Sequence, residues 1–226
     1  KVYIKDRTGI ILDIFNKHAK TKESKTQIKL AKFQYLLPRL TRQWTHLERQ
    51  MGGVGTTGGP GETQIEIDRR LIRNQIIKLK KDLKKISKSR KIQTKNRKNI
   101  FKVSLVGYTN AGKSSLMQKM SKKTSYIKDE LFSTLDTSTK KIKVDKNRHF
   151  ILSDTVGFIR NLPDNLIASF RSTLGELIDS DLLLKIIDIS SHEHEIHLES
   201  IDNVLKHLEI SDKKYIIVFN KIDNLE

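Results

Sequence analysis

Residues 107–114 constrain the fold of this chain more than any other stretch. They read GYTNAGKS and fit the pattern G-x-x-x-x-G-K-[ST], whose glycines let backbone N–H groups surround phosphate oxygens. A β-branched run over 102–106 precedes the stretch, and a helical pattern over 113–120 follows it. This order matters because the N-terminus of a helix adds partial positive charge beside a bound phosphate. The stretch therefore predicts a P-loop domain of the α/β class.

The pattern of residues 99–226 agrees with such a domain. Short β-branched runs alternate there with helical patterns, which is typical of a mostly parallel sheet flanked by helices. Two runs at 140–145 and 148–153, joined by a short polar turn, predict a hairpin that adds one antiparallel strand at an edge. The expected parallel strands are 102–106, 150–153, 182–189 and 215–219, and the expected helices are 113–120, 163–178 and 193–208.

The P-loop pattern assigns roles to individual side chains. Lys113 has the position that reaches the β- and γ-phosphates of a nucleotide, and Ser114 has the position that binds Mg²⁺. The residues expected to contact the nucleotide in this stretch are Gly107, Tyr108, Thr109, Asn110, Ala111, Gly112, Lys113, Ser114 and Ser115.

Two further motifs identify the nucleotide. In D-x-x-G at 154–157, the aspartate holds Mg²⁺ indirectly and the glycine N–H reaches the γ-phosphate. In N-K-x-D at 220–223, the last carboxylate can accept both the N1–H and the N2–H₂ donors of guanine, a pair that adenine lacks. The three motifs in this order predict GTP rather than ATP. The additional contact residues are Asp154, Thr155, Val156, Gly157, Asn220, Lys221, Ile222 and Asp223.

The loop at 126–139 is expected to be the first nucleotide-dependent switch. Thr134 is the candidate for adding its hydroxyl to Mg²⁺ when the γ-phosphate is present, with Thr137 and Thr139 as alternatives. The expected metal ligands are Ser114, Thr134 and Asp154, and the expected catalytic residues are Lys113, Thr134 and Gly157.

Phe158 follows the glycine of the D-x-x-G motif. Many GTPases place a glutamine at this position, where it orients the attacking water. A phenyl ring cannot do this, so we expect slow intrinsic hydrolysis that needs a partner to organise the water.

The chain has seven histidines, and none of them belongs to a recognisable metal-binding pattern. His192, His194 and His197 cluster among glutamates where the helical pattern of 193–208 begins. We interpret this cluster as an exposed polar helix end.

Two heptad seams precede the P-loop domain, with apolar residues at alternating spacings of three and four. Pro38 interrupts the first seam and is expected to kink or split that helix. Two helices of this kind joined by a short loop predict an antiparallel helical hairpin. The seam residues are Leu30, Phe33, Leu37, Leu40, Trp44, Leu47 and Met51 in the first helix, and Ile72, Ile76, Leu79, Leu83 and Ile86 in the second, which is expected over about 63–90.

The stretch 51–62 between the seams reads MGGVGTTGGPGE and contains six of the eleven glycines. Residues 53–58 match G-x-G-x-x-G, the pattern of a dinucleotide-binding turn, but a helix rather than a strand precedes them. Glycines also let the backbone turn tightly and approach packed RNA closely. We therefore expect a hairpin tip that contacts RNA rather than a nucleotide site.

The net charge of +18 lies entirely in the first 100 residues, which carry 26 Lys and Arg against 8 Asp and Glu, whereas the remainder carries 18 of each. This uneven distribution favours a polyanionic partner, most simply nucleic acid. No apolar run approaches the roughly 20 residues that span a bilayer. The residues expected to bind RNA are Gly52, Gly53, Gly55, Thr56, Thr57, Gly58, Gly59, Arg69, Arg70 and Arg73.

These features together resemble the HflX family of ribosome-associated GTPases, within the Obg–HflX superfamily. The resemblance implies binding to the large ribosomal subunit, splitting of ribosomes under stress, and a hairpin loop that inserts toward the peptidyl-transferase region of ribosomal RNA. It also implies that Thr134, within the switch residues Phe132, Ser133, Thr134, Leu135 and Asp136, binds Mg²⁺. The matching segments are 6–9, 35–40, 60–64, 68–70, 107–114, 132–136 and 154–162.

The chain departs from the family pattern in its glycine loop, which is one residue longer than usual and lacks an arginine. Against the family pattern we expect a fragment. Residues 1–20 are the remnant of an N-terminal α/β subdomain, 21–98 form the helical hairpin, and 99–226 form a GTPase domain truncated at its C-terminus. Asn110 has the position where some cation-activated GTPases help to hold K⁺, although an asparagine that fits the turn is an equal alternative.

The leading hypothesis is a Mg²⁺-dependent, GTP- and GDP-binding switch that hydrolyses GTP and associates with the 50S subunit. One alternative is a GTPase that acts on another RNA, and a second is an RNA-binding module with a weak or vestigial nucleotide site. Intact Lys113, Ser114, Asp154 and Asp223 argue against the second alternative. We expect a cytoplasmic monomer that can associate with membranes peripherally.

Overall fold

The computed structural model describes residues 4–40, 64–94, 100–121, 137–160 and 174–225. The glycine-rich stretch, the first switch, the initial strand and most of the helix expected over 163–178 lie outside these residues. Among the described residues, none of the helices combines the length and the apolar composition that a membrane crossing requires.

A five-stranded sheet forms the centre of the C-terminal half, with the strand order β2-β3-β1-β4-β5. Neighbouring strands are parallel except for β2 and β3, which form the predicted antiparallel hairpin at one edge. The mostly parallel α/β fold expected from the sequence is therefore confirmed. The strands are β1 (Lys102–Gly107), β2 (Ser138–Lys143), β3 (His149–Asp154), β4 (Leu182–Asp188) and β5 (Tyr215–Asn220).

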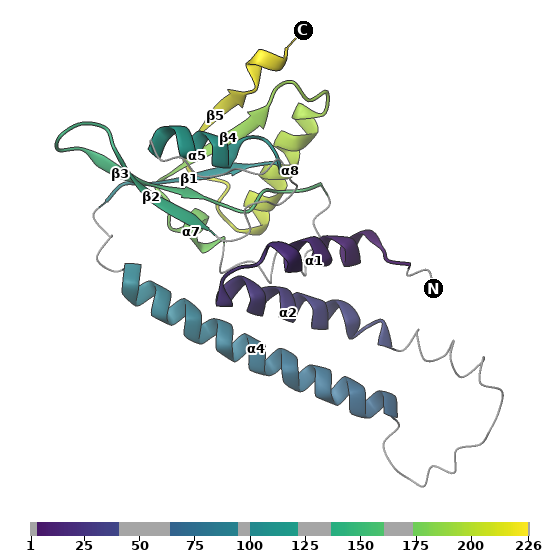
Figure 1. The fold of residues 1–226 in the computed structure, drawn as a ribbon. Coiled ribbons are helices and arrows are strands. Elements are labelled where there is room, and N and C mark those ends of the chain that lie inside the picture. The colour runs from purple at the N-terminus through teal and green to yellow at the C-terminus, as the bar shows by residue number, and fades with distance from the viewer. Residues whose placement is uncertain (1–3, 41–63, 95–99, 122–136, 161–173, 226) are drawn as a thin grey trace, which may run out of the picture.

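Helices cover both faces of this sheet (Figure 1). Helix α5 (Lys113–Ser121) contacts β1, β2 and β3, and α8 (His194–His207) contacts β4 and β1 on the other side. Side chains alternate between the two faces along each strand, so Leu105 and Leu152 pack toward α5, whereas Val106 and Leu183 pack in the cluster with α8. A short helix, α7 (Gly175–Ile178), precedes β4.

Three helices precede the sheet: α1 (Arg7–His18), α2 (Lys22–Leu36) and α4 (Gln64–Thr94). Helix α2 contacts both α1 and α4, and Figure 1 shows α2 and α4 running side by side in opposite directions. Leu79 of the second seam is buried, and the other seam residues of α4 are half-buried. Helix α2, which carries the start of the first seam, ends at Leu36, just before Pro38, as the ring of proline requires.

Asp6 connects the start of α1 to the end of α2. Its Oδ1 accepts hydrogen bonds from the N–H of Gly9 (2.8 Å) and the hydroxyl of Tyr35 (2.7 Å), and its Oδ2 pairs with Arg39 at 2.6 Å. The Gly9 N–H and the Tyr35 hydroxyl hold the pKa of Asp6 below its usual range. Any Cβ at Gly9 would lie 3.0 Å from the Tyr35 hydroxyl, so the close approach favours glycine.

This arrangement predicts that Asp6→Ala lowers the free energy of unfolding by about 1–2 kcal/mol, because it removes a helix N-cap. The matched control is Asp13→Ala on α1, which removes a carboxylate that pairs with Lys5 and with Lys32 of α2. This substitution should cost at most about 1 kcal/mol, because these ion pairs are solvent-exposed. Urea unfolding of both variants measures the difference. Equal destabilisation by the two substitutions would contradict the role assigned to Asp6.

Candidate nucleotide site

The carboxyl ends of the parallel strands meet at one edge of the sheet and bring the three sequence motifs together. The P-loop follows β1, the D-x-x-G motif begins at the last residue of β3, and the N-K-x-D motif begins at the last residue of β5. In open α/β sheets, ligands bind outside this edge. The tertiary structure therefore joins segments that lie more than one hundred residues apart in the chain.

Gly112 and Asn220 join the P-loop to the N-K-x-D motif. The Asn220 Nδ2 donates a hydrogen bond to the carbonyl of Ala111 at 2.8 Å. Gly112 has a φ of 92°, in the left-handed region, and a Cβ there would lie 2.1 Å from the Asn220 Nδ2. The second glycine of the P-loop is thus required both by its backbone conformation and by the space that Asn220 occupies.

Lys113 is the first residue of α5 and is 5 % exposed. Its Nζ donates to the carbonyls of Tyr108 (2.7 Å) and Gly107 (3.1 Å), which hold the ammonium over the loop. Burial lowers the pKa of Lys113 to about 8, and the charge of Asp154 opposes this shift. A bound phosphate would supply the negative charge that this buried cation favours.

Ser114 and Asp154 place two oxygen ligands at the same point. The Ser114 Oγ donates to the Asp154 Oδ2 at 2.6 Å, and the carboxylate is 2 % exposed. Hard oxygen donors of this kind suit Mg²⁺. The residues present therefore fit the divalent cation that a P-loop requires, with Ser114 and Asp154 as the described members of the predicted set.

The D-x-x-G segment is paired to the P-loop by backbone hydrogen bonds. The N–H of Phe158 donates to the Gly107 carbonyl (3.0 Å), and the N–H of Thr109 donates to the Phe158 carbonyl (2.7 Å). A Cβ on Gly157 would lie 2.7 Å from the Thr109 Cα and 3.0 Å from the Lys113 Nζ. This contact leaves room only for glycine at position 157.

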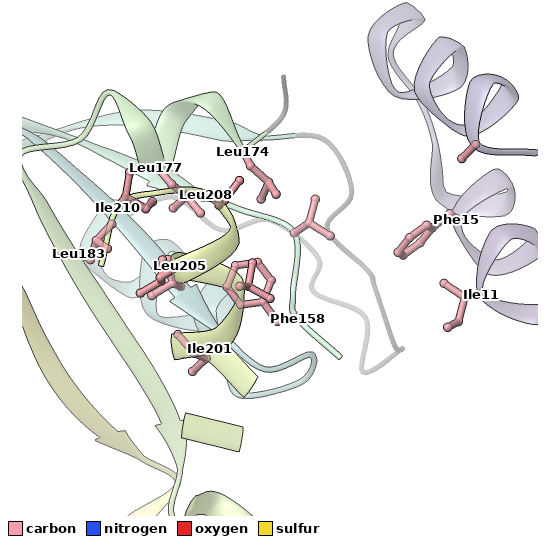
Figure 2. Close-up of a cluster of buried hydrophobic side chains, with 14 of the residues drawn as sticks. Ile11, Phe15, Phe158, Leu174, Leu177, Leu183, Ile201, Leu205, Leu208 and Ile210 are labelled. Carbon is pink, nitrogen blue, oxygen red and sulfur yellow. The ribbon is translucent and has the colours of Figure 1, made fainter. Parts of the chain in front are cut away.

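Phe158 is 2 % exposed, and its ring lies among buried hydrophobic side chains (Figure 2). It belongs to the buried cluster that includes Ile201 and Leu205 of α8, with Ile11 and Phe15 of α1 on the facing side. Its ring is therefore part of the hydrophobic core, and no other role for it is needed to explain an aromatic residue there.

Sequence patterns alone did not identify Asp188 and Ser190. Asp188 ends β4 and pairs with Lys221 of the N-K-x-D motif (2.8 Å), and it also accepts hydrogen bonds from the N–H and hydroxyl of Ser190. Burial opposes the shift, but Lys221 and Ser190 lower the pKa of Asp188 below its usual value. A polar residue at the carboxyl end of a predicted parallel strand was the signal that could have found it.

His197 corrects the interpretation of the histidine cluster. Its ring stacks on Tyr108 of the P-loop with the ring centroids 3.8 Å apart, and its side chain is only 12 % exposed. Burial lowers the pKa of His197, with Glu193 and Asp188 acting in the opposite direction. His192 is exposed as expected, but His197 is an internal contact between α8 and the P-loop.

The remaining predicted residues are placed as follows. Asn110 has a φ of 62°, a conformation that asparagine tolerates better than most residues, so the residue fits the turn. Ser115 is exposed on α5, and Asp223 is exposed in the short 3₁₀ helix Ile222–Asn224. Phe132, Ser133, Thr134, Leu135 and Asp136 lie outside the described residues, as do Gly52, Gly53, Gly55, Thr56, Thr57, Gly58 and Gly59.

Two family models match the chain. The model described as "50S ribosome-binding GTPase" matches residues 102–221, and the model described as "GTP-binding GTPase Middle Region" matches residues 18–97. The chain is 50 % identical to the GTPase HflX of Flavobacterium psychrophilum over 97 % of its length, and 45 % identical to that of Escherichia coli over 98 %. The chain belongs to the HflX family of P-loop GTPases.

The fold comparison agrees with this assignment. A GTP-binding protein of Sulfolobus solfataricus, solved in complex with GDP, is similar to this HflX family member with a TM-score of 0.55 and 30 % identity, covering 97 % of this chain and 56 % of that one. A second solved complex, of SsGBP with GDP, gives a TM-score of 0.58 and 31 % identity, covering 98 % and 59 %. The chain spans about half the length of the HflX relatives it matches, 53 % for the F. psychrophilum protein and 52 % for the E. coli protein.

The geometry around Gly112 predicts that Gly112→Ala weakens GDP binding by roughly tenfold or more. A left-handed conformation costs a non-glycine residue about 1–3 kcal/mol, and about 1.4 kcal/mol corresponds to tenfold in affinity. Gly175→Ala is the matched control, because no heavy atom lies within 4 Å of the added methyl group. Titration with a fluorescent GDP analogue compares the two variants, and equal affinities would contradict the steric argument.

The pKa of Lys113 predicts that GDP affinity falls as the pH rises from about 7 to about 9. The phosphate-free protein loses the Lys113 proton near pH 8, whereas the bound phosphate requires the charged form. Above that pH, binding must therefore restore a proton, and the dissociation constant rises toward roughly tenfold per pH unit. The same fluorescence titration at several pH values measures this, and a constant affinity across the range would show that Lys113 does not titrate there.

Proposed function

We propose that this protein binds GTP and GDP with Mg²⁺ and hydrolyses GTP. The observation that carries the proposal is the convergence of Lys113, the Ser114–Asp154 pair, Gly157 and Asn220 at one edge of the sheet. A vestigial site would not need a buried Lys113 held by two backbone carbonyls. It would also not need glycine at positions 112 and 157, where a methyl group would meet neighbouring atoms. The convergence favours an active nucleotide site over a passive RNA-binding module.

Each residue has a role that follows from its position. Lys113 neutralises the β- and γ-phosphates, the Gly157 N–H contacts the γ-phosphate, and backbone N–H groups of 107–115 surround the remaining oxygens. Ser114, Asp154 and Thr134 are the proposed ligands of Mg²⁺, which when bound neutralises charge that develops on the phosphate oxygens. Residues 220–223 select guanine, and Asp188 positions Lys221 beside the base site.

Hydrolysis by this site alone is slow. The residue after Gly157 is a buried phenylalanine, so no side chain at that position orients the attacking water. A partner must therefore complete the catalytic site, which makes the protein a switch whose turnover depends on what it binds.

The proposed partner is the large ribosomal subunit and its RNA. The family model that matches residues 102–221 carries the description "50S ribosome-binding GTPase". The outward face of α4, opposite its apolar seam, is strongly basic, as expected of a surface that contacts RNA phosphates. The exposed cations of this face are Arg70, Arg73, Lys78, Lys80, Lys81, Lys84, Lys85 and Lys88, and Arg69 lies half-buried beside them.

The basic face of α4 also supports an RNA-binding role for the helical hairpin of residues 21–98. Helices α2 and α4 form the two sides of a hairpin whose tip, residues 51–62, contacts ribosomal RNA. The cellular task that fits this arrangement is ribosome splitting or rescue under stress, performed in the cytoplasm by a monomer. A GTPase that acts on a different RNA is the second candidate, because the basic face of α4 does not by itself select ribosomal RNA.

The deciding experiment measures GTP hydrolysis by the full-length protein with and without purified 50S subunits. We expect stimulation of at least about tenfold, since a missing water-positioning group is worth that much or more in related switches. A variant with residues 52–61 shortened tests the tip and should lose both stimulation and 50S binding. Absence of stimulation by 50S, with stimulation by another RNA, would select the second candidate.

The same assay in KCl and in NaCl tests a monovalent cation near Asn110. We propose K⁺ as a further cofactor, held beside the phosphates, on the basis of the position of Asn110 in the P-loop. Faster hydrolysis in KCl supports this, and equal rates would leave the asparagine with its turn-forming role alone.

A further inference from the structure

The backbone of Arg160 is held on both sides of its Cα by parts of the chain that lie far apart in sequence. Its N–H donates to the hydroxyl of Tyr108 in the P-loop at 3.1 Å. Its carbonyl accepts from the guanidinium of Arg7, the first residue of α1. This one residue, three positions after Gly157, is therefore where the P-loop, the D-x-x-G segment and α1 meet.

The segment from Gly157 to Arg160 is positioned by backbone pairing with the P-loop, by side chains in the core and by the two hydrogen bonds to the Arg160 backbone. Its pairing with the P-loop ends at Phe158, where the Tyr108–Phe158 bridge supplies the last backbone hydrogen bonds to that loop. The Phe158 ring enters the core and fixes the inner end of the segment. Ile159 is half-buried against the same core, whereas Arg160 is exposed, so the outer end of the segment is held by the Tyr108 and Arg7 contacts with the Arg160 backbone.

The Tyr108 ring is itself held in place. It stacks on His197 of α8 with the two rings nearly parallel, at 18°. Because α8 packs on the sheet through Ile201 and Leu205, the stacked ring presents its hydroxyl from a rigid support. A tyrosine in this orientation explains why the second residue of the P-loop carries a large side chain that the phosphates do not need.

The contact from α1 is supported in the same way. Asp6 caps α1 immediately before Arg7, and Ile11 and Phe15 bury the inner face of the helix in the cluster that also contains Val156 and Phe158. Helix α1 is thus anchored to the core next to the segment that Arg7 reaches. A guanidinium that donates to a carbonyl forms a charge-assisted hydrogen bond, which is stronger than a neutral one.

We propose that Tyr108 and Arg7 are positioning residues that hold the two peptide groups on either side of the Arg160 Cα and thereby set the position of the Gly157 N–H for the γ-phosphate. The proposal rests on the nucleotide site proposed above. It gives α1 a role in hydrolysis, because the contact of Arg7 with Arg160 would transmit a displacement of α1 to the Gly157 N–H. GDP, which lacks the γ-phosphate, should not sense either residue.

The test compares Arg7→Ala, Tyr108→Phe and the double variant in the full-length protein. Each single variant should lower kcat for GTP roughly threefold to tenfold, the range that loss of one hydrogen bond produces, with KM and GDP affinity within about twofold of the original. The double variant should be no slower than the slower single variant, because both contacts hold the backbone of the same residue. Arg7→Lys should restore part of the loss.

Lys5→Ala is the matched control, since it removes another exposed cation, one that pairs with Asp13 of α1 rather than with Arg160. It should hydrolyse GTP at the original rate. Unchanged kcat in both single variants, effects that multiply in the double variant, or an equal loss of GDP affinity would each overturn the proposal.

Amide hydrogen exchange at Arg160, measured by NMR, separates this inference from the proposed function. Exchange should be faster in Tyr108→Phe and in Arg7→Ala than in Lys5→Ala, even if the unaltered protein proves unable to hydrolyse GTP. Failure of hydrolysis with faster exchange would reject only the GTPase assignment. Exchange that is unchanged in both variants would reject the positioning role whatever the activity.

Discussion

The parallel pairing of β1 with β3, continued beyond both strands, is the constraint on which the nucleotide site depends. The ladder aligns Leu105 with Asp154, and the hydrogen bonds between Gly107, Thr109 and Phe158 extend the pairing into the two motif loops. This extension brings Asp154 to Ser114 and Gly157 to Lys113. Because Lys113, Ser114 and Asp154 all follow from this ladder, a shift of β3 by one residue would separate the lysine from the carboxylate and turn the side chains of the strand to the opposite faces.

Close packing around the loops explains which residues are required. Two glycines face atoms that leave no space for a Cβ: Asn220 lies over Gly112, and the Thr109 backbone lies over Gly157. Lys113 is almost fully buried and is held by two backbone carbonyls, an arrangement that is electrostatically incomplete without a bound anion. A buried cation and tight glycine contacts together form a site shaped for phosphate before any ligand arrives, which reduces the reorganisation needed on binding.

The helical part of the chain combines a structural and an electrostatic function. Its apolar seams join α4 to α2, while the opposite face of α4 carries a row of exposed cations. Helix α1 is attached at one end by the Asp6–Tyr35–Arg39 cluster and reaches the D-x-x-G segment through Arg7. A basic helical part that contacts the D-x-x-G segment through α1 gives binding of a polyanion a physical route to the proposed nucleotide site.

The sequence by itself determined the α/β class, the antiparallel edge strand, the two seams, the helix end before Pro38 and the three motifs, because periodicity, proline geometry and phosphate-loop chemistry are local properties. It also predicted which residues contact the nucleotide, as the spacing of the motifs is set by strand and loop lengths. Only the tertiary structure decided that His197 stacks on Tyr108, that Asp188 pairs with Lys221, and that Arg7 and Tyr108 both contact the backbone of Arg160. These contacts join residues from different strands and helices, so their partners depend on the strand order and on how α1 and α8 pack, and no local pattern encodes either.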